Sequence, residues 1–259
     1  MLITFAQRAA SAIALAPTPT SPLVTTGGAE LPAGPDHAIV HVDSARHTVV
    51  VTVGPYHIVP ATHRDGGMHA GHGVPATQVF AWPVDGWVRG IALRVIGANG
   101  HELPRTLLHH LAIINFGRRQ LLKPTPERVV AFGQETSDMS LPKTVGIPVT
   151  AGMPMAVTLG WDNQTSDVLG DVRLELTIDW MPATTMPRPV SAYPVSMDVV
   201  GAVGELSDYD LPAGETRQAI SFTMPVDGRI LAAGGHLHDF GTTLRVDEGF
   251  ACTVAARTN

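Results

Sequence analysis

The sequence has little cysteine, and this limits the covalent and metal chemistry that the chain can support. Cys252 is the only cysteine among 259 residues. No disulfide can therefore form within one chain, and a zinc or iron–sulfur site built on thiolates would have at most one ligand. Any metal site would have to use histidine, aspartate, glutamate or methionine.

Charge is also scarce, and it is not concentrated anywhere. Charged residues make up 15% of the chain, the formal net charge is -6, and no run is rich in lysine and arginine. These features argue against a surface for nucleic acid or for an anionic membrane. We expect a small-molecule or peptide-like substrate instead, and no nucleic-acid partner.

Long apolar runs are absent as well, since a membrane span needs about 20 such residues. Residues 9–16, AASAIALA, follow Arg8 and end in a small-x-small pattern that loosely resembles a short secretory signal. The segment after it, PTPTSPLVTTGG, is typical of an extended leader. We interpret residues 1–45 as a flexible leader or signal-like segment, and favour a secreted or periplasmic protein over a cytoplasmic one.

Glycine and proline, in contrast, are plentiful, with 26 and 21 residues, and 44% of the chain is apolar. This composition favours many short strands joined by tight turns over long helices. Apolar segments bounded by Gly, Pro, Asn or Asp predict an all-β protein. The expected strands lie at 47–53, 77–82, 87–96, 107–116, 144–150, 155–161 and 172–178.

A repeated turn suggests two related units. FAWPVDGWVRGIALRV at 80–95 aligns without gaps with FTMPVDGRILAAGGHL at 222–237, an offset of 225 − 83 = 142 residues. In each copy a Pro-Val-Asp-Gly turn leads into an apolar run, and a pair of histidines follows. We interpret the two copies as a duplicated unit, the alternative being two unrelated hairpins that share a common turn.

The segment 179–194, DWMPATTMPRPVSAYP, is too rich in proline for a paired strand and is the best candidate for a linker. We therefore predict a first β-sandwich over 46–181, a linker over 182–194, and a shorter second unit over 195–259.

Two histidine pairs carry a metal-ligand pattern. His236 and His238 stand two residues apart, so on a strand both imidazoles project from one face and can approach one ion. Asp239 would lie on the opposite face. His109 and His110 are adjacent, and adjacent strand residues can bind one ion only at a strand end or a bulge. The alternative for this pair is one buried, hydrogen-bonded histidine and one exposed histidine.

A third cluster, HRDGGMHAGHG at 63–73, carries His63, Met68, His69 and His72 in a glycine-rich segment. It could capture a soft or borderline ion such as copper, but ordering a flexible loop around a metal costs entropy. We favour a solvated loop here.

Taken in order, LLHHLAIINF, SLPKTVGIPV, LGWDNQT and LPAGETRQAISFTMPVDGRILAAGGHLHDFGTTLRV resemble a known family. They are similar to the copper type II, ascorbate-dependent monooxygenases, in particular to bacterial relatives of peptidylglycine α-hydroxylating monooxygenase. The most specific elements are the His-His pair and the Gly-His-x-His pair, in that order. The resemblance implies two tandem jelly-roll-like β-sandwiches, each carrying one copper, with ascorbate as the reductant.

The resemblance also implies roles for the histidines. The first copper would be held by His109 and His110 with a third ligand on a later strand. The second copper, where dioxygen and the substrate C–H bond react, would be held by His236 and His238 with a methionine further on. Close relatives tend to have a histidine as the third ligand of the first site, whereas Asp162 occupies that position here. A carboxylate is a harder, anionic ligand that would favour Cu(II).

Only 21 residues (259 − 238) follow His238, fewer than the family needs to reach its methionine. We therefore expect an incomplete second sandwich and a chain that does not hydroxylate on its own. Two functions stay open. One is a copper-dependent monooxygenase-like oxidoreductase that hydroxylates an activated C–H of an unidentified substrate with O2 and ascorbate. The other is a non-enzymatic β-sandwich that binds copper or zinc or serves in an interaction.

Overall fold

The computed structural model of the chain describes residues 2–6, 36–61, 76–136, 138–197, 214–217, 219–235, 237, 241–247 and 253–257. Within these residues the chain forms sixteen strands, two short 3-10 helices and no α-helix. The predicted all-β class is therefore confirmed. No helix in the described ranges has the length and apolar character that crossing a bilayer requires.

In chain order the strands are β1 (Leu2–Ala6), β2 (Ile39–Asp43), β3 (Thr48–Ile58), β4 (Ala76–Ala81), β5 (Gly86–Ile96), β6 (Glu102–Leu103), β7 (Leu108–Arg119), β8 (Pro126–Gly133), β9 (Met139–Ser140), β10 (Val145–Val149), β11 (Pro154–Trp161), β12 (Leu169–Pro182), β13 (Val190–Ser196), β14 (Arg229–Gly234), β15 (Thr243–Asp247) and β16 (Thr253–Arg257). The 3-10 helices are η1 (Ala98–Gly100) and η2 (Arg105–Leu107).

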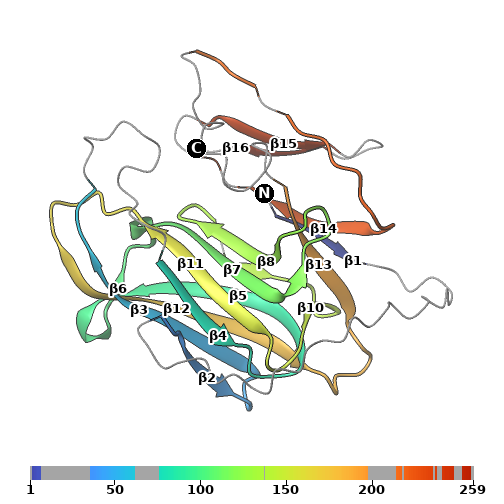
Figure 1. Ribbon diagram of the computed structural model, residues 1–259, viewed down its shortest axis with the longest axis horizontal. Coiled ribbons are helices and arrows are strands. Elements are labelled where there is room, and N and C mark those ends of the chain that lie inside the picture. The colour runs from blue at the N-terminus through green and yellow to red at the C-terminus, as the bar shows by residue number, and fades with distance from the viewer. Residues whose placement is uncertain are drawn as a thin grey trace.

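Two sheets face each other and enclose the main hydrophobic core (Figure 1). The larger sheet runs in the order β14-β1-β13-β10-β5-β12-β3-β2, with β6 and β9 attached to β5. The smaller sheet runs in the order β4-β11-β7-β8, and the hairpin β15–β16 forms a sheet of its own. This arrangement is a β-sandwich. The tandem jelly-roll form stays a prediction.

The core follows from alternation along the central strands of the larger sheet. In β3, Val49, Val51 and Val53 are fully buried. Val51 is paired with Leu176 of β12, which is paired with Leu93 of β5. Because successive side chains alternate between the faces of a strand, such rows place one apolar layer toward the smaller sheet. Removing this layer from water stabilises the sandwich.

All seven strands predicted from the apolar pattern are present, as β3, β4, β5, β7, β10, β11 and β12. Their ends differ from the prediction by a few residues. The predicted strand 172–178, for example, extends over Leu169–Pro182. β8 has no counterpart among the predicted strands, because Pro126 and Glu127 interrupt its apolar pattern.

Two strands lie within residues 1–45, where the sequence predicts a flexible leader. β1 pairs with both β13 and β14, and β2 pairs along its whole length with β3. Val40 and Val42 of β2 pack against the core, while the alternate residues Ile39 and His41 are exposed. The first sandwich therefore begins before residue 46. The signal-like segment 9–16 lies outside the described residues.

Both ends of the predicted linker 182–194 lie in strands. β12 ends at Pro182, which is paired with Gly86, and β13 begins at Val190, which is paired with Val145 of β10. Pro194 is accommodated within β13, because a strand position that donates no ladder hydrogen bond tolerates proline. The expectation that this segment makes no paired strand is wrong. The division into two domains stays a prediction.

The two Pro-Val-Asp-Gly turns are each followed directly by a strand, β5 after the first and β14 after the second. Only the first turn also has a strand, β4, shortly before it. At this turn Gly86 has a φ of 152°, and a Cβ there would collide with the carbonyl oxygen of Met181, so the position requires glycine. β5 and β14 belong to the same sheet, separated by β10, β13 and β1. The duplication stays a prediction, because much of 198–259 lies outside the described residues.

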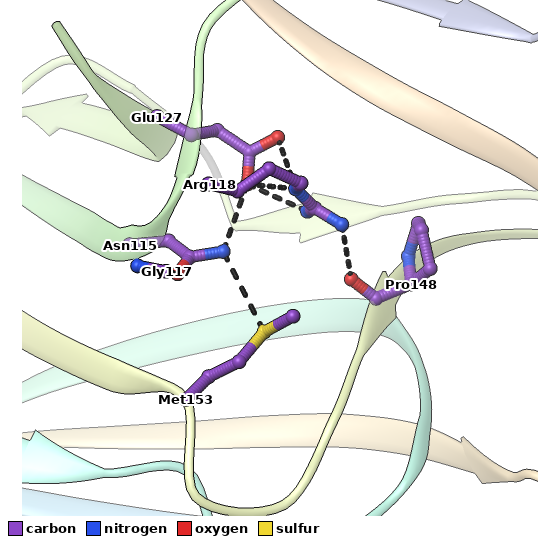
Figure 2. A network of polar contacts seen from close by, with 6 residues as sticks. All are labelled: Asn115, Gly117, Arg118, Glu127, Pro148 and Met153. Atoms are coloured by element: carbon purple, nitrogen blue, oxygen red, sulfur yellow. Dashed lines mark hydrogen bonds and ion pairs between the residues drawn. The ribbon is translucent and has the colours of Figure 1, made fainter. Parts of the chain in front are cut away.

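A buried carboxylate ties the two sheets together toward the far end of β7. Glu127 is 2% exposed and accepts hydrogen bonds from Arg118 Nε at 2.9 Å and from Asn115 Nδ2 at 3.1 Å. Arg118 Nη1 donates to the Pro148 carbonyl of β10 at 2.8 Å, and Asn115 Nδ2 lies 3.7 Å from Met153 Sδ (Figure 2). The charge of Glu127 is thus both paired and hydrogen-bonded, which is what makes its burial tolerable.

Candidate metal centre

His109 and His110 lie at the second and third positions of β7, where its pairing with β11 is irregular. His110 is paired with Gly160 and Leu108 with Trp161, so one step along β11 corresponds to two steps along β7. His109 is therefore the extra residue of a β-bulge at the start of the strand. An adjacent pair can reach one ion only at a strand end or a bulge, and both conditions are met here.

The bulge brings the two imidazole rings together. Their centroids are 4.8 Å apart and the ring planes are inclined by 68°, whereas a regular strand would hold the rings on opposite faces. Both residues are partly exposed, so His109 and His110 are not the one buried and one exposed histidine of the alternative interpretation. The separation is compatible with both rings binding one ion through a nitrogen at about 2.0–2.1 Å.

Gly160 makes room for the His110 ring. A Cβ at position 160 would lie 3.0 Å from Cε1 and 3.3 Å from Nε2 of this ring. Any larger side chain would therefore push the imidazole away, because a packed ring cannot give way without strain. The sequence pattern did not single out this glycine, since its partner lies on another strand.

Cross-strand pairing shows which face of the smaller sheet carries His110. Ala112 is paired with Thr158 on one side and with Ala131 on the other, and His110 is paired with Gly160. Directly paired residues share a face, and Ala112 is buried but does not belong to the main core cluster. His110 therefore lies on the outer face of the smaller sheet, which we define as the face turned away from the larger sheet. Its neighbours there are small residues.

Asp162, the predicted third ligand, directly follows β11 at the same end of the sandwich. Its N–H donates to the Leu107 carbonyl at 2.8 Å, and its carboxylate Oδ1 accepts from Gln164 Nε2 at 2.5 Å. In the part of the chain that the structure describes, no three His, Cys, Asp or Glu side chains gather into a metal site. The described residues therefore offer a histidine pair without a third ligand, and both metal binding by the pair and the assignment of Asp162 as the third ligand stay predictions.

Asn163 shapes the loop that carries Asp162, a role that the sequence pattern did not reveal. Asn163 is 1% exposed. Its Nδ2 donates to the Asp167 carbonyl at 2.8 Å, and its Oδ1 accepts from the N–H and the hydroxyl of Thr165 at 3.1 and 2.7 Å. Its own carbonyl accepts from the Ala61 N–H at 2.8 Å. These bonds form an Asx-type turn that fixes the backbone next to Asp162.

An aromatic pair borders the start of β7. Trp161, which is paired with Leu108, makes an edge-to-face contact with Tyr56 at 5.7 Å between ring centroids. Burial raises the pKa of the Tyr56 phenol to about 12, because the phenolate would lose hydration. The pair therefore packs on the core side of the start of β7 and stays neutral at physiological pH.

Arg105, on η2 just before β7, adds a charged group at this end of the sandwich. Its Nη1 donates to Asp138 Oδ1 at 2.9 Å, and its guanidinium carbon lies 5.7 Å from the centroid of the Phe132 ring. Phe132 is paired with Leu111, the residue after His110. Because Asp138 neutralises the guanidinium, Arg105 does not by itself oppose a cation at the histidine pair.

The remaining predicted ligands lie outside the described residues. They are His236 and His238 of the second predicted copper site, with Asp239 beside them, and the histidine-rich segment 63–73. The second copper site therefore stays a prediction from the sequence.

Comparison of the chain with protein-family models, with curated proteins and with solved structures gives no match. The geometry itself defines an all-β sandwich that presents a converging histidine pair at one end of its smaller sheet.

Proposed function

We propose that the chain is a copper-dependent monooxygenase-like protein that hydroxylates an activated C–H of a small-molecule or peptide-like substrate with O2 and ascorbate. The observation that carries this proposal is the bulge at His109, which brings the rings of His109 and His110 to 4.8 Å. The order of the His-His and Gly-His-x-His pairs along the sequence supports the same function.

In this proposal each histidine pair has its own role. His109 and His110 hold the copper that receives electrons, and His236 and His238 hold the copper at which O2 and the substrate react. Bound copper would supply one-electron chemistry by cycling between Cu(I) and Cu(II), both of which accept imidazole ligands. Ascorbate is the source of the electrons.

The chain's own residues prepare the first site. Gly160 leaves the space that the His110 ring occupies. Trp161 and Tyr56 pack against the core beneath the start of β7, and Asn163 fixes the loop in which Asp162 would supply a third ligand. Such supporting contacts orient metal ligands and tune their affinity.

A second candidate function is a non-enzymatic β-sandwich that binds copper or zinc. The observation in its favour is that no third ligand joins the histidine pair among the described residues. The carboxylate of Asp162 is instead hydrogen-bonded to Gln164. Two imidazoles alone would hold a metal weakly, with water completing the coordination.

The test is ascorbate-dependent O2 uptake, coupled to product formation, by the copper-loaded protein in a form that also carries the methionine ligand expected for the second site. The monooxygenase proposal expects uptake that is lost both in H109A/H110A and in H238A. Stoichiometric metal binding without uptake would favour the second candidate. H41A, at an exposed position of β2, is the matched control and should change neither metal content nor uptake.

The role of Asp162 is tested separately by competition with a Cu(I) chelator. D162H should tighten Cu(I) binding, because a softer neutral ligand replaces a carboxylate, and D162A should weaken Cu(II) binding. Unchanged copper affinities in both variants would show that Asp162 is not a ligand, and would not affect the assignment of the histidine pair.

A further inference from the structure

The described sheets end in several edge strands, and two of these, β4 and β8, carry protective features. Residues 36–38 cover part of the β4 edge, with Ala38 N–H donating to the Val79 carbonyl at 3.0 Å and Val79 N–H donating to the Asp36 carbonyl at 2.8 Å. At the other edge of the smaller sheet, β8 begins with Pro126 and skips Val129 in its pairing with β7. Proline and bulges are devices that keep an edge from pairing with another chain.

The edge of the larger sheet is protected only in part. β3 extends six residues beyond its pairing with β2, from Val53 to Ile58. This extension contains Pro55, which has no N–H to donate. β2 itself, Ile39–Asp43, contains no proline and no lysine, and its register with β3 has no bulge.

β2 is the last strand of the larger sheet, and no strand of the described residues pairs with its other side. Ile39 is 69% exposed, more than any other large apolar side chain in a described strand. Val40 and Val42 pack against the core but are only partly buried. An edge that is regular and largely apolar, and that no described strand covers, is a template for pairing with a further strand.

We propose that a second copy of the chain pairs with this edge, β2 against β2, antiparallel about His41. A two-fold axis at His41 places Val40 opposite Val42 of the partner and Ile39 opposite Asp43 of the partner, each twice, so the interface is self-complementary and its two inner contacts are apolar. The two larger sheets then form one continuous sheet, and the partly buried valines of both copies become covered.

The charges at this edge are compatible with self-pairing. Asp43, the one acidic residue of β2, is turned toward the β2–β3 connection. Its Oδ1 accepts from the N–H groups of Ala45 and Arg46 at 3.0 Å, and its Oδ2 accepts from Arg46 Nη1 at 3.2 Å. His41 faces only its own counterpart at the axis. Because five residue pairs bury little surface, the dimer is of the transient class and depends on concentration.

Cross-linking tests the register directly. In a C252S background, H41C places two thiols at the axis, where paired Cα atoms lie about 4.5–5.5 Å apart, within the range of about 4.4–6.8 Å that disulfides span. H41C should therefore oxidise to a covalent dimer. V168C, at an exposed loop position (54% exposed), is the matched control and should stay largely monomeric.

Sedimentation equilibrium tests the association without a cross-link. The unmodified chain should show a concentration-dependent dimer, and H41K should raise its Kd at least about tenfold, because two ammonium groups would face each other at the axis. V168K should leave the Kd unchanged, and equal circular dichroism spectra would show that the variants fold. A monomer at all concentrations, or a dimer that H41K leaves intact and H41C does not cross-link, would overturn the proposal.

Discussion

The outer faces of the two sheets differ sharply in charge. Across the outer face of the larger sheet, Arg94 pairs with Glu175 at 2.5 Å and Arg89 with Asp179 at 3.7 Å. In the corresponding rows of the smaller sheet, cross-strand pairing joins residues such as Ala112, Thr158 and Ala156. The ionisable side chains among the paired residues of those rows are His110 and Arg128.

This difference in charge follows the difference in exposure between the two outer faces. A face in contact with water carries polar and charged residues along alternate positions, as the larger sheet does. The paired residues on the outer rows of the smaller sheet are mostly small or apolar, and Ala156 is only 1% exposed although it lies outside the main core cluster. His110 thus stands at the end of a row of mainly small residues.

The largest expected effect on the free energy of unfolding comes from removing a buried carboxylate, compared with removing one on the solvated face. E127A leaves Arg118 partly buried without its carboxylate, and we expect it to lower the free energy of unfolding by about 3–5 kcal/mol. E175A breaks a surface pair with Arg94 and should lower it by about 0–1 kcal/mol. Urea denaturation of both variants measures the difference. Equal losses would mean that burial does not separate the two carboxylates.

Introducing a carboxylate on each outer face should give the second largest effect on stability. A156D places a carboxylate at a buried position of the smaller sheet, and we expect a loss of about 2–4 kcal/mol. A92D, at a partly exposed position on the outer face of the larger sheet, should change stability by less than about 1 kcal/mol. Thermal unfolding compares them. If A156D were as mild as A92D, the outer face of the smaller sheet would be solvated after all.

Two glycine-to-alanine substitutions, one in each sheet, extend the comparison to the candidate metal site. In G160A the new Cβ meets the His110 ring at 3.0 Å, whereas in G90A it meets Asp179 Oδ2 at 3.1 Å, the end of a flexible side chain. G160A should cost about 1 kcal/mol of stability and weaken copper binding about tenfold, because it displaces a ligand. G90A should leave copper binding unchanged. Copper titration decides, and equal affinities in the two variants would show that Gly160 does not position His110.

The smallest effect is a pH dependence from Tyr56. Because burial raises its pKa to about 12 from 10.0, the folded chain holds the phenol proton at pH values where the unfolded chain loses it. The contribution of Tyr56 is therefore fully present below pH 10 and is lost as the pH rises toward 12. Y56F should flatten the fall in stability between pH 10 and 12. An unchanged alkaline profile in Y56F would assign that fall to other groups.

The strands could be predicted where one face is buried and the other is not. In β3 and β12, valine and leucine at alternate positions predict a strand with one buried face. β8 and β13 could not be predicted, because Glu127 and Pro194 break the pattern. Their accommodation depends on partners on other strands, such as Arg118 of β7 for Glu127, and a local pattern does not contain such partners.

Of the candidate site, the residue types could be predicted but the geometry could not. Two adjacent histidines specify a ligand pair only if a bulge re-aims one of them, and the bulge at His109 arises from the pairing of β7 with β11. Gly160 clears the space for His110 from across that pairing. Neither feature follows from the residues next to the histidines in the sequence.

The central claim is that His109 and His110 hold one metal ion together, and copper stoichiometry tests it most directly. Elemental analysis of the copper-loaded chain, repeated for H109A/H110A and for the control H41A, measures equivalents bound per chain. We predict that the double variant binds one equivalent less than both the unmodified chain and H41A, with all three equally folded by circular dichroism. Equal copper content in all three proteins would contradict the claim.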